Sequence, residues 1–147
     1  MPSPSNPAAI NRIIDANINR AKEGLRVCEE IARFILNSSV LTSEFKQVRH
    51  RLDSALKRLA PRIALIKHRN SLSDVGRDIY AGELKRKDLR DVFFANIQRT
   101  KESIRVLEEF SKLKDTGAAI GFKKLRYRVY EIEKSAVKKV ASLCSHR

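Results

Sequence analysis

The sequence has no tryptophan and contains few residues that break helices. Only five Gly and four Pro occur in 147 residues, and three of the four Pro lie within the first seven positions. The rest of the chain is rich in Ala, Leu, Ile, Lys, Arg and Glu, which are common in helices. This composition argues against a β architecture with many turns and favours long helices.

The sequence also lacks long apolar runs and a cysteine framework. No apolar run approaches the ~18 residues of a transmembrane helix, and the first residues contain no apolar signal-peptide core. Two cysteines, Cys28 and Cys144, are too few for a set of disulfides, so we expect reduced thiols. We therefore expect a cytoplasmic protein without a membrane partner.

Several catalytic and binding motifs are absent. The chain has no GxxxxGKS/T or GxGxxG phosphate loop, no nucleophile turn and no Cys/His set with metal-ligand spacing. Its three histidines, His50, His68 and His146, form no obvious dyad. Without tryptophan or an ordered aromatic motif, a platform for stacking nucleic-acid bases is poorly supported.

The charge of the chain is strongly positive. Its 31 Lys and Arg outnumber 17 Asp and Glu, which gives a net charge of +14. Such a protein attracts anions, and both nucleic acid and phosphorylated metabolites fit this charge. With 42% hydrophobic and 33% charged residues, the chain fits one globular domain, as a monomer or a homodimer.

The most informative positive feature is an internal repeat. Ala16–Glu30 returns 79 residues later as Ala95–Glu109, with ten of 15 residues identical and most of the identical ones polar. A second match, Phe45–Leu52 with Phe122–Val129, is offset by 77 residues. Amphipathic helices share apolar patterns by chance, but not the same Asn, Arg and Glu at the same spacing. The repeat therefore indicates a duplication.

The repeat predicts an all-α fold of two αα-hairpins. After a disordered lead at 1–6, we expect one helical domain over 7–143, with repeat halves at 7–60 and 88–143 and a linker at 61–87. Two such hairpins predict a four-helix-bundle-like domain with approximate two-fold symmetry. Caps and breakers give the expected helices: Pro7–Leu36 after Asn6, Thr42 or Ser43 to Leu59, Arg62–Lys67, Asp88 to Lys114 closed by residues 115–117, and Phe122–Leu143.

Two polar residues interrupt the apolar face of the first helix. At about 100° per residue, Asn17 lies at the centre of that face and Arg20 lies inside the same arc. Both return in the second copy, as Asn96 and Arg99. Burying such groups without partners costs about one to several kcal/mol each. They either form a polar network that fixes helix register or bind a ligand, and the pattern leaves both open.

Some charged neighbours of Asn17 and Arg20 are expected beside Arg20, and others on the solvent side of the helix. Glu23 and Glu30 border the Arg20 side of the helix, within i,i+3 or i,i+4 reach of an arginine. Gly24 leaves that side open to another backbone or to a ligand. The residues expected on the solvent side are Lys22, Lys101, Glu29 and Glu108.

The second helix of each half is basic. It contains Arg49 and Arg51 in the first half and Arg126 and Arg128 in the second. Single arginines of this kind are usually surface salt-bridge partners. Together with the repeated arginines of the long helices, they would also suit a phosphate clamp, because guanidinium groups hold phosphate oxygens bidentately.

One loop combines a carboxylate with a flexible backbone. Asp74, Val75 and Gly76 follow Arg69 in the only long irregular segment of the sequence. A D-x-G triplet alone is usually a turn. Because this triplet lies in a long loop of an all-α protein, a ligand-binding loop is an alternative to a simple turn.

Taken together, these motifs resemble one known family. Arg12–Val27, Asp74–Gly76, Ala95–Phe110 and Leu125–Tyr127 are similar to an all-helical domain that occurs alone or fused ahead of thiamine-phosphate synthase. The resemblance covers residues 10–133 and implies a monofunctional hydroxymethylpyrimidine phosphate kinase, unrelated in fold to the ribokinase-like bifunctional enzyme. Because no synthase barrel follows, we expect the stand-alone form.

The resemblance implies a reaction of thiamine biosynthesis, in which ATP phosphorylates 4-amino-5-hydroxymethyl-2-methylpyrimidine phosphate with Mg²⁺ as cofactor. The pyrimidine phosphate and a nucleotide are then the partners. The candidate catalytic and metal-binding residues are Glu23, Glu102 and Asp74. The candidates for binding substrate and phosphate are Asn17, Arg20, Arg26, Arg49, Arg69, Gly76, Asn96, Arg99, Arg105 and Arg126.

The sequence departs from the family pattern at one position. It has Arg69-Asn70-Ser71 where the resemblance leads us to expect Arg-Asp-Ser, so Asp74 becomes the better candidate for a metal ligand. Asn17 and Asn96 are candidates for contacting the pyrimidine amine or orienting a carboxylate.

Two alternatives to a kinase remain open. One is a non-catalytic basic module that binds nucleic acid or phosphorylated ligands through its second and fourth helices. The other is a regulatory relative of the kinase that has lost activity. Nucleic acid is the less favoured partner, because binding a phosphate backbone requires surface charge rather than Asn on an apolar face. The loop at 70–87 occurs once, which favours one composite site over two equivalent sites.

Overall fold

The chain folds into an all-α structure, as composition and repeat predict. The computed structural model describes residues 6–78 and 81–144, so the lead at 1–5, His146 and the Cys144 side chain lie outside the described part. No strand occurs within these ranges. The elements are α1 (Pro7–Glu30), the π-helical turn η1 (Ile31–Ile35), α2 (Ser39–Leu56), α3 (Arg62–His68), the 3₁₀ turn η2 (Ala81–Leu84), α4 (Leu89–Ser111), α5 (Thr116–Ala141) and the 3₁₀ turn η3 (Ser142–Cys144).

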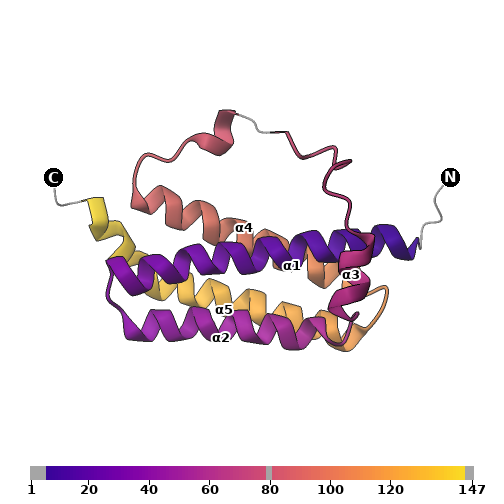
Figure 1. The fold of residues 1–147 in the computed structure, drawn as a ribbon. Helices are drawn as coiled ribbons and strands as arrows, with labels where there is room; N and C mark the ends of the chain where they lie inside the picture. The colour runs from indigo at the N-terminus through magenta and orange to yellow at the C-terminus, as the bar shows by residue number, and fades with distance from the viewer. Residues whose placement is uncertain (1–5, 79–80, 145–147) are drawn as a thin grey trace.

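Four long helices form a bundle (Figure 1). α1 packs against α4 and α2, and α5 closes the ring by packing against the same two helices. The short helix α3 packs across the first part of α1, and the segment after it arches over the bundle before α4 begins (Figure 1). The all-α class is confirmed, and the two-fold relation between the halves stays a prediction.

The core runs between the four helices and is made of large apolar side chains. Leu25 of α1, Phe45 of α2, Phe93 of α4 and Phe122 of α5 are all completely buried. Phe45 and Phe122 occupy equivalent positions of the repeat, so both copies supply the core as their amphipathic pattern predicts. Within the ranges described, no helix has both the length and the apolar character needed to span a bilayer.

Side-chain caps decide where most helices begin. Asn6 and Asp88 accept hydrogen bonds from the first turns of α1 and α4, as predicted. The start of α2 was expected at Thr42 or Ser43, and this prediction is wrong. The Ser38 hydroxyl caps that helix instead, so α2 gains nearly one turn at its beginning.

The start of α5 differs most from expectation. Residues 115–117 were predicted to close the previous helix, but the Asp115 carboxylate accepts the Gly117 N–H at 2.8 Å and caps α5. The helix therefore begins at Thr116 rather than at Phe122. Gly117 is the second residue of α5, and the Arg58 guanidinium, the end of a flexible side chain, lies where its Cβ would be.

The connection from α1 to α2 is wider than an α-helical turn. The Leu36 N–H donates to the Ile31 carbonyl and the Ser38 N–H to the Ala32 carbonyl, both at 2.9 Å. These bonds span five and six residues, where an α-helix spans four. Asn37 completes the turn with a φ of 49°, which Asn adopts more readily than most residues.

α1 and α4 lie in close contact at Gly24. A methyl group added there would lie 2.7 Å from the Asn96 carbonyl oxygen and would clash with the Thr100 hydroxyl. That hydroxyl hydrogen-bonds to the carbonyl oxygens of Asn96 at 3.0 Å and of Ala21 at 3.3 Å, which joins the two helices. Gly24 thus admits another backbone, one of the two roles expected for it, and the backbone is that of α4.

Candidate functional site

A cavity of about 690 Å³ lies between α1 and the segment that follows α3. On α1 the lining residues run from Ala9 to Glu23, and because many of them are three or four positions apart they lie on one side of the helix. The segment after α3 forms the opposite wall. The lining combines the guanidinium groups of Arg12, Arg20 and Arg69, the carboxylates of Asp15, Glu23 and Asp74, the polar Asn17, Asn19, Asn70 and Ser71, and the apolar Ala9, Ile13 and Ala16.

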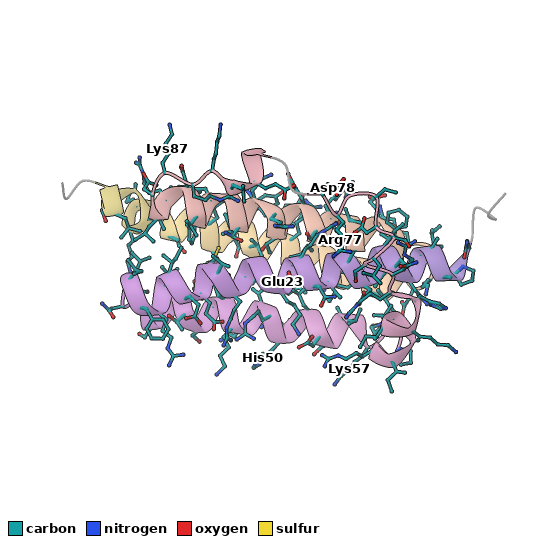
Figure 2. The ribbon with its side chains drawn as sticks, turned by 45° about the horizontal axis from the view of Figure 1, so that its top comes forward. Glu23, His50, Lys57, Arg77, Asp78 and Lys87 are labelled. Atoms are coloured by element: carbon teal, nitrogen blue, oxygen red, sulfur yellow. The ribbon has the colours of Figure 1, made fainter. Side chains whose placement is uncertain are left out.

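The cavity brings together five of the residues predicted from the sequence, namely Asn17, Arg20, Glu23, Arg69 and Asp74. Gly76 adjoins them, because its N–H donates to Asp74 Oδ1 at 2.8 Å and closes a turn. Figure 2 shows Glu23 near the middle of α1, with Arg77 on the segment above it in that view. The D-x-G turn and the cavity wall therefore belong to one stretch of chain.

An ion pair that the sequence analysis did not select supports this wall. Arg69 Nε and Nη2 donate to the two carboxylate oxygens of Asp15 at 2.7 and 2.8 Å. Asn19 Nδ2 adds a third donor to this carboxylate at 3.3 Å. The hydrogen bonds from Arg69 to Asp15, followed by the charge of Asp15, raise the pKa of Arg69 above its usual value. The two hydrogen bonds to Asp15 hold the guanidinium in the wall.

The repeated Asn residues behave as the helical phase predicts, but the repeated Arg residues do not. Asn17 is only 6% exposed and Asn96 is half-buried. Each amide donates to the carbonyl one turn earlier in its own helix at 2.8 Å. Arg20 and Arg99 were expected inside the apolar arc, and both are exposed. They stand at the edge of that arc, from which a long side chain carries its charged end into solvent.

The two acidic residues expected on the solvent side, Glu29 and Glu108, are 4% exposed, so this prediction is wrong. Arg49 binds Glu29 through two hydrogen bonds of 3.0 and 3.3 Å, and Arg126 binds Glu108 through two of 2.9 and 3.4 Å. The hydrogen bond to Glu108 raises the pKa of Arg126. Each acid lies beside the neighbouring basic helix, which excludes water from it.

Two more binding candidates belong to the same ion-pair clusters. Arg26 pairs with Glu29 and Glu30, and Arg105 pairs with Glu108 and its neighbour, all within 3.4 Å. Arg49 and Arg126 therefore join neighbouring helices, whereas the pairs of Arg26 and Arg105 lie within a single helix. None of these four arginines lines the cavity. Lys22 and Lys101, also expected in solvent, are half-buried in ion pairs with Asp53 and Glu133 at 2.8 Å.

The candidates from the second copy of the repeat lie elsewhere. Glu102 lines a different cavity of about 350 Å³, with Arg105, Arg126 and Tyr130 among its neighbours. The structure therefore does not bring Glu102 together with Glu23 and Asp74. In the described part of the chain, no group of three or more His, Cys, Asp or Glu is arranged to hold a metal ion.

Comparison with known proteins identifies the family. Residues 12–135 match the ThiD2 family, which is most of the chain. The chain belongs to the ThiD2 family. It is 44% identical to a thiamine-phosphate synthase of Synechocystis sp. over 132 residues, which are 88% of this chain and 36% of that protein. It is 43% identical to a thiamine-phosphate synthase of Rhodopirellula baltica, over 90% of this chain and 35% of that one.

The ThiD2 match includes both copies of the repeat and every polar residue that lines the cavity. A third relative, a thiamine-phosphate synthase of Nostoc punctiforme, is 39% identical over 84% of this chain and 34% of its own length. The chain thus spans about a third of the length of these curated relatives. No solved structure has significant similarity to it. The family connects the chain with thiamine biosynthesis.

Proposed function

We propose that this chain transfers a phosphoryl group from ATP to hydroxymethylpyrimidine phosphate. One observation carries the proposal: three guanidinium groups and two exposed carboxylates from α1 and the single loop converge on one cavity. Membership of the ThiD2 family and the resemblance of the motifs to hydroxymethylpyrimidine phosphate kinases support the same activity. The relatives are thiamine-phosphate synthases, which is consistent with a reaction of thiamine biosynthesis.

The cavity has the charge that phosphoryl transfer requires. This reaction depends mainly on positioning the two reactants and neutralising the charge of their phosphates. Arg12, Arg20 and Arg69 would hold phosphate oxygens, since guanidinium groups bind them bidentately and keep their charge at any physiological pH. Arg12 joins the candidates here, because it lines the cavity on the same flank as Arg20.

Glu23 and Asp74 would hold Mg²⁺. Both carboxylates are exposed and line the same cavity, whereas the Asp15 carboxylate is already bound by Arg69. Mg²⁺ is usually held by one or two carboxylates together with substrate phosphates and water, so two acids are enough. When bound, the ion would neutralise the charge that develops on the transferred phosphoryl group.

The apolar strip of the cavity suits a heteroaromatic ring. Ala9, Ile13 and Ala16 lie side by side along the flank of α1, and Asn17 adjoins them with its amide. A methylpyrimidine would pack on the strip, while Asn17 would contact the ring amine. This arrangement separates the apolar part of the substrate from its phosphate, which faces the arginines.

A coupled assay of ADP release with ATP, Mg²⁺ and the pyrimidine phosphate tests the proposal. The repeat supplies a matched control, because Arg20 and Glu23 line the cavity while their equivalents Arg99 and Glu102 do not. We expect Arg20→Ala and Glu23→Gln each to lower kcat/KM about tenfold or more, and Arg99→Ala and Glu102→Gln to change it by less than about twofold. No turnover at millimolar substrate would rule out the kinase and leave a non-catalytic relative.

A further inference from the structure

Three consecutive residues, the last of α3 and the two that follow it, are each bound to α1. They form the root of the segment that makes the outer wall of the cavity. All three partners lie within the first three turns of α1. The contacts are His68 Nδ1 with Asn11 Nδ2 at 3.1 Å, Arg69 with Asp15 at 2.7 and 2.8 Å, and the Asn70 carbonyl with Arg12 Nη2 at 3.4 Å.

The contact between Asp15 and Arg69 is the strongest of the three. It is bidentate and charge-assisted, whereas His68 makes a single hydrogen bond and the contact of Asn70 is long. The Asp15 side chain is 8% exposed and the Arg69 side chain 42%. The carboxylate is thus the buried, fixed partner, and the guanidinium is the partner that reaches the open cavity.

The ion pair of Asp15 and Arg69 lies between two cavities. A smaller cavity of about 270 Å³ lies on the other side of the pair, enclosed by α1, α2 and α3. Asp15 and Arg69 line both cavities, so they form part of the wall between them. Without the carboxylate, nothing in the described contacts of Arg69 would keep its side chain on the side of the larger cavity.

We propose that Asp15 is a positioning residue, which holds Arg69 against the larger cavity and fixes the root of the segment that carries Ser71 and Asp74. Both Asp15 oxygens accept hydrogen bonds from Arg69, so Asp15 acts through Arg69 rather than on a ligand. The expected effect of Asp15 on turnover rests on the proposed function. Its expected effect on the position of Arg69 and of the following segment is independent of that function.

The first test is a double-mutant cycle of Asp15→Asn, Arg69→Gln and the double variant, measured by ADP release. We expect each single variant to lower kcat/KM about tenfold or more and the double variant to lower it no further, because the two residues act as one unit. The double variant also removes the buried lone carboxylate that Arg69→Gln alone would leave. Additive losses, or unchanged kinetics in Asp15→Asn, would overturn the proposal.

The second test does not depend on turnover. Trypsin must bind the side chain of the arginine it cleaves after, so the Asp15 contact should protect the bond after Arg69, while Arg77 on the same segment is exposed and serves as the internal reference. We expect Asp15→Asn to raise cleavage after Arg69 about tenfold relative to Arg77. An unchanged ratio would refute the positioning role.

A matched variant controls both tests. Lys22 and Asp53 form another ion pair of α1 at 2.8 Å, which lines the smaller cavity but not the larger one. Asp53→Asn should leave kcat/KM and the cleavage ratio within about twofold of the unchanged protein. If the unchanged protein shows no turnover, the kinase proposal fails, and the trypsin ratio still decides whether Asp15 positions Arg69.

Discussion

At the scale of single residues, the contact between α1 and α4 depends on the absence of a side chain at Gly24. The Asn96 carbonyl would lie 2.7 Å from an added methyl group, and because it is backbone it cannot move without shifting α4. Ser103 is the equivalent residue of the second copy and is buried with a side chain in place. The two copies therefore differ at a position where the helices are in close contact.

We expect Gly24→Ala to destabilise the protein by about 1–3 kcal/mol, although Ala is the better helix former by about 1 kcal/mol. Urea unfolding followed by circular dichroism would measure the change. Ser103→Ala is the matched control and should cost less than about 1 kcal/mol. A Gly24→Ala variant as stable as the unchanged protein would contradict the close crossing.

Cys28 lies in the same interface and carries a protonated thiol. Burial, and secondly the negative charge of Glu133, raise its pKa from 9.0 to about 12. The folded state therefore holds this proton more tightly than the unfolded state, and the free energy of unfolding decreases as pH rises above about 9, by at most ~1.4 kcal/mol per pH unit.

The difference in unfolding free energy between the unchanged protein and Cys28→Ala, measured at pH 8 and pH 10, isolates this contribution. Other alkaline titrations occur in both proteins and cancel. We expect the advantage of the unchanged protein to shrink by about 1 kcal/mol over this interval. An equal difference at both pH values would show that the thiol ionises normally.

At the scale of elements, α1 is buried on more than one face. It packs against α4 through the arc around Asn17, against α2 through the side of Glu29, and against α3 through Asp15. Relative to Asn17, Glu29 lies at roughly 120° and Asp15 at roughly 160° along the helical wheel. Hydrophobic periodicity does not reveal the ion pairs that contribute to the last two contacts, because charged residues leave no apolar signal.

This division explains which site residues could be predicted. Asn17 and Gly24 were found because each is out of place on an apolar face, which periodicity detects. Asp15, Glu29 and Glu108 were missed or misplaced because their partners come from other helices, and a helical wheel carries no information about what faces its polar side. Tertiary contacts decide such positions.

The ion pairs between helices give a prediction for Arg49. Its side chain is 17% exposed and that of Glu29 is 5% exposed, so removing the arginine leaves a carboxylate nearly shielded from water. We expect Arg49→Met to destabilise the protein by about 2–4 kcal/mol, and Glu29→Leu combined with Arg49→Leu to cost much less. Thermal unfolding would measure both. Equal losses in the two variants would indicate that packing rather than charge holds α1 to α2.

At the scale of the whole molecule, one loop joins the two halves of the repeat, and its first residues are hydrogen-bonded to α1 in the first half. The sequence was enough to predict the duplication, the all-α class and the four long helices. These features follow from the hydrophobic periodicity and from the identical residues of the two repeat copies. The side on which the loop lies could not be predicted, since its contacts to α1 are made by His68, Arg69 and the Asn70 backbone. Because the loop lies against α1, the cavity forms beside Glu23 and not beside Glu102.

Ligand binding should therefore stabilise the molecule through one half only. At Mg²⁺–ATP concentrations ten times the Kd, we expect an increase of about 1.4 kcal/mol in the free energy of unfolding, seen as a higher Tm. Arg20→Gln should abolish most of the shift and Arg99→Gln should retain it. A shift that both variants reduce equally would indicate two sites, one in each half.

The turn between α1 and α2 accommodates a difference in length between the two halves. The offset between the copies falls from 79 to 77 across it, so the first hairpin is two residues longer than the second. The Ser38 N–H reaches back six residues to Ala32, two more than in an α-helix. The wide turn thus accommodates the two additional residues of the first hairpin at the end of the bundle, while Phe45 and Phe122 are both fully buried in the core.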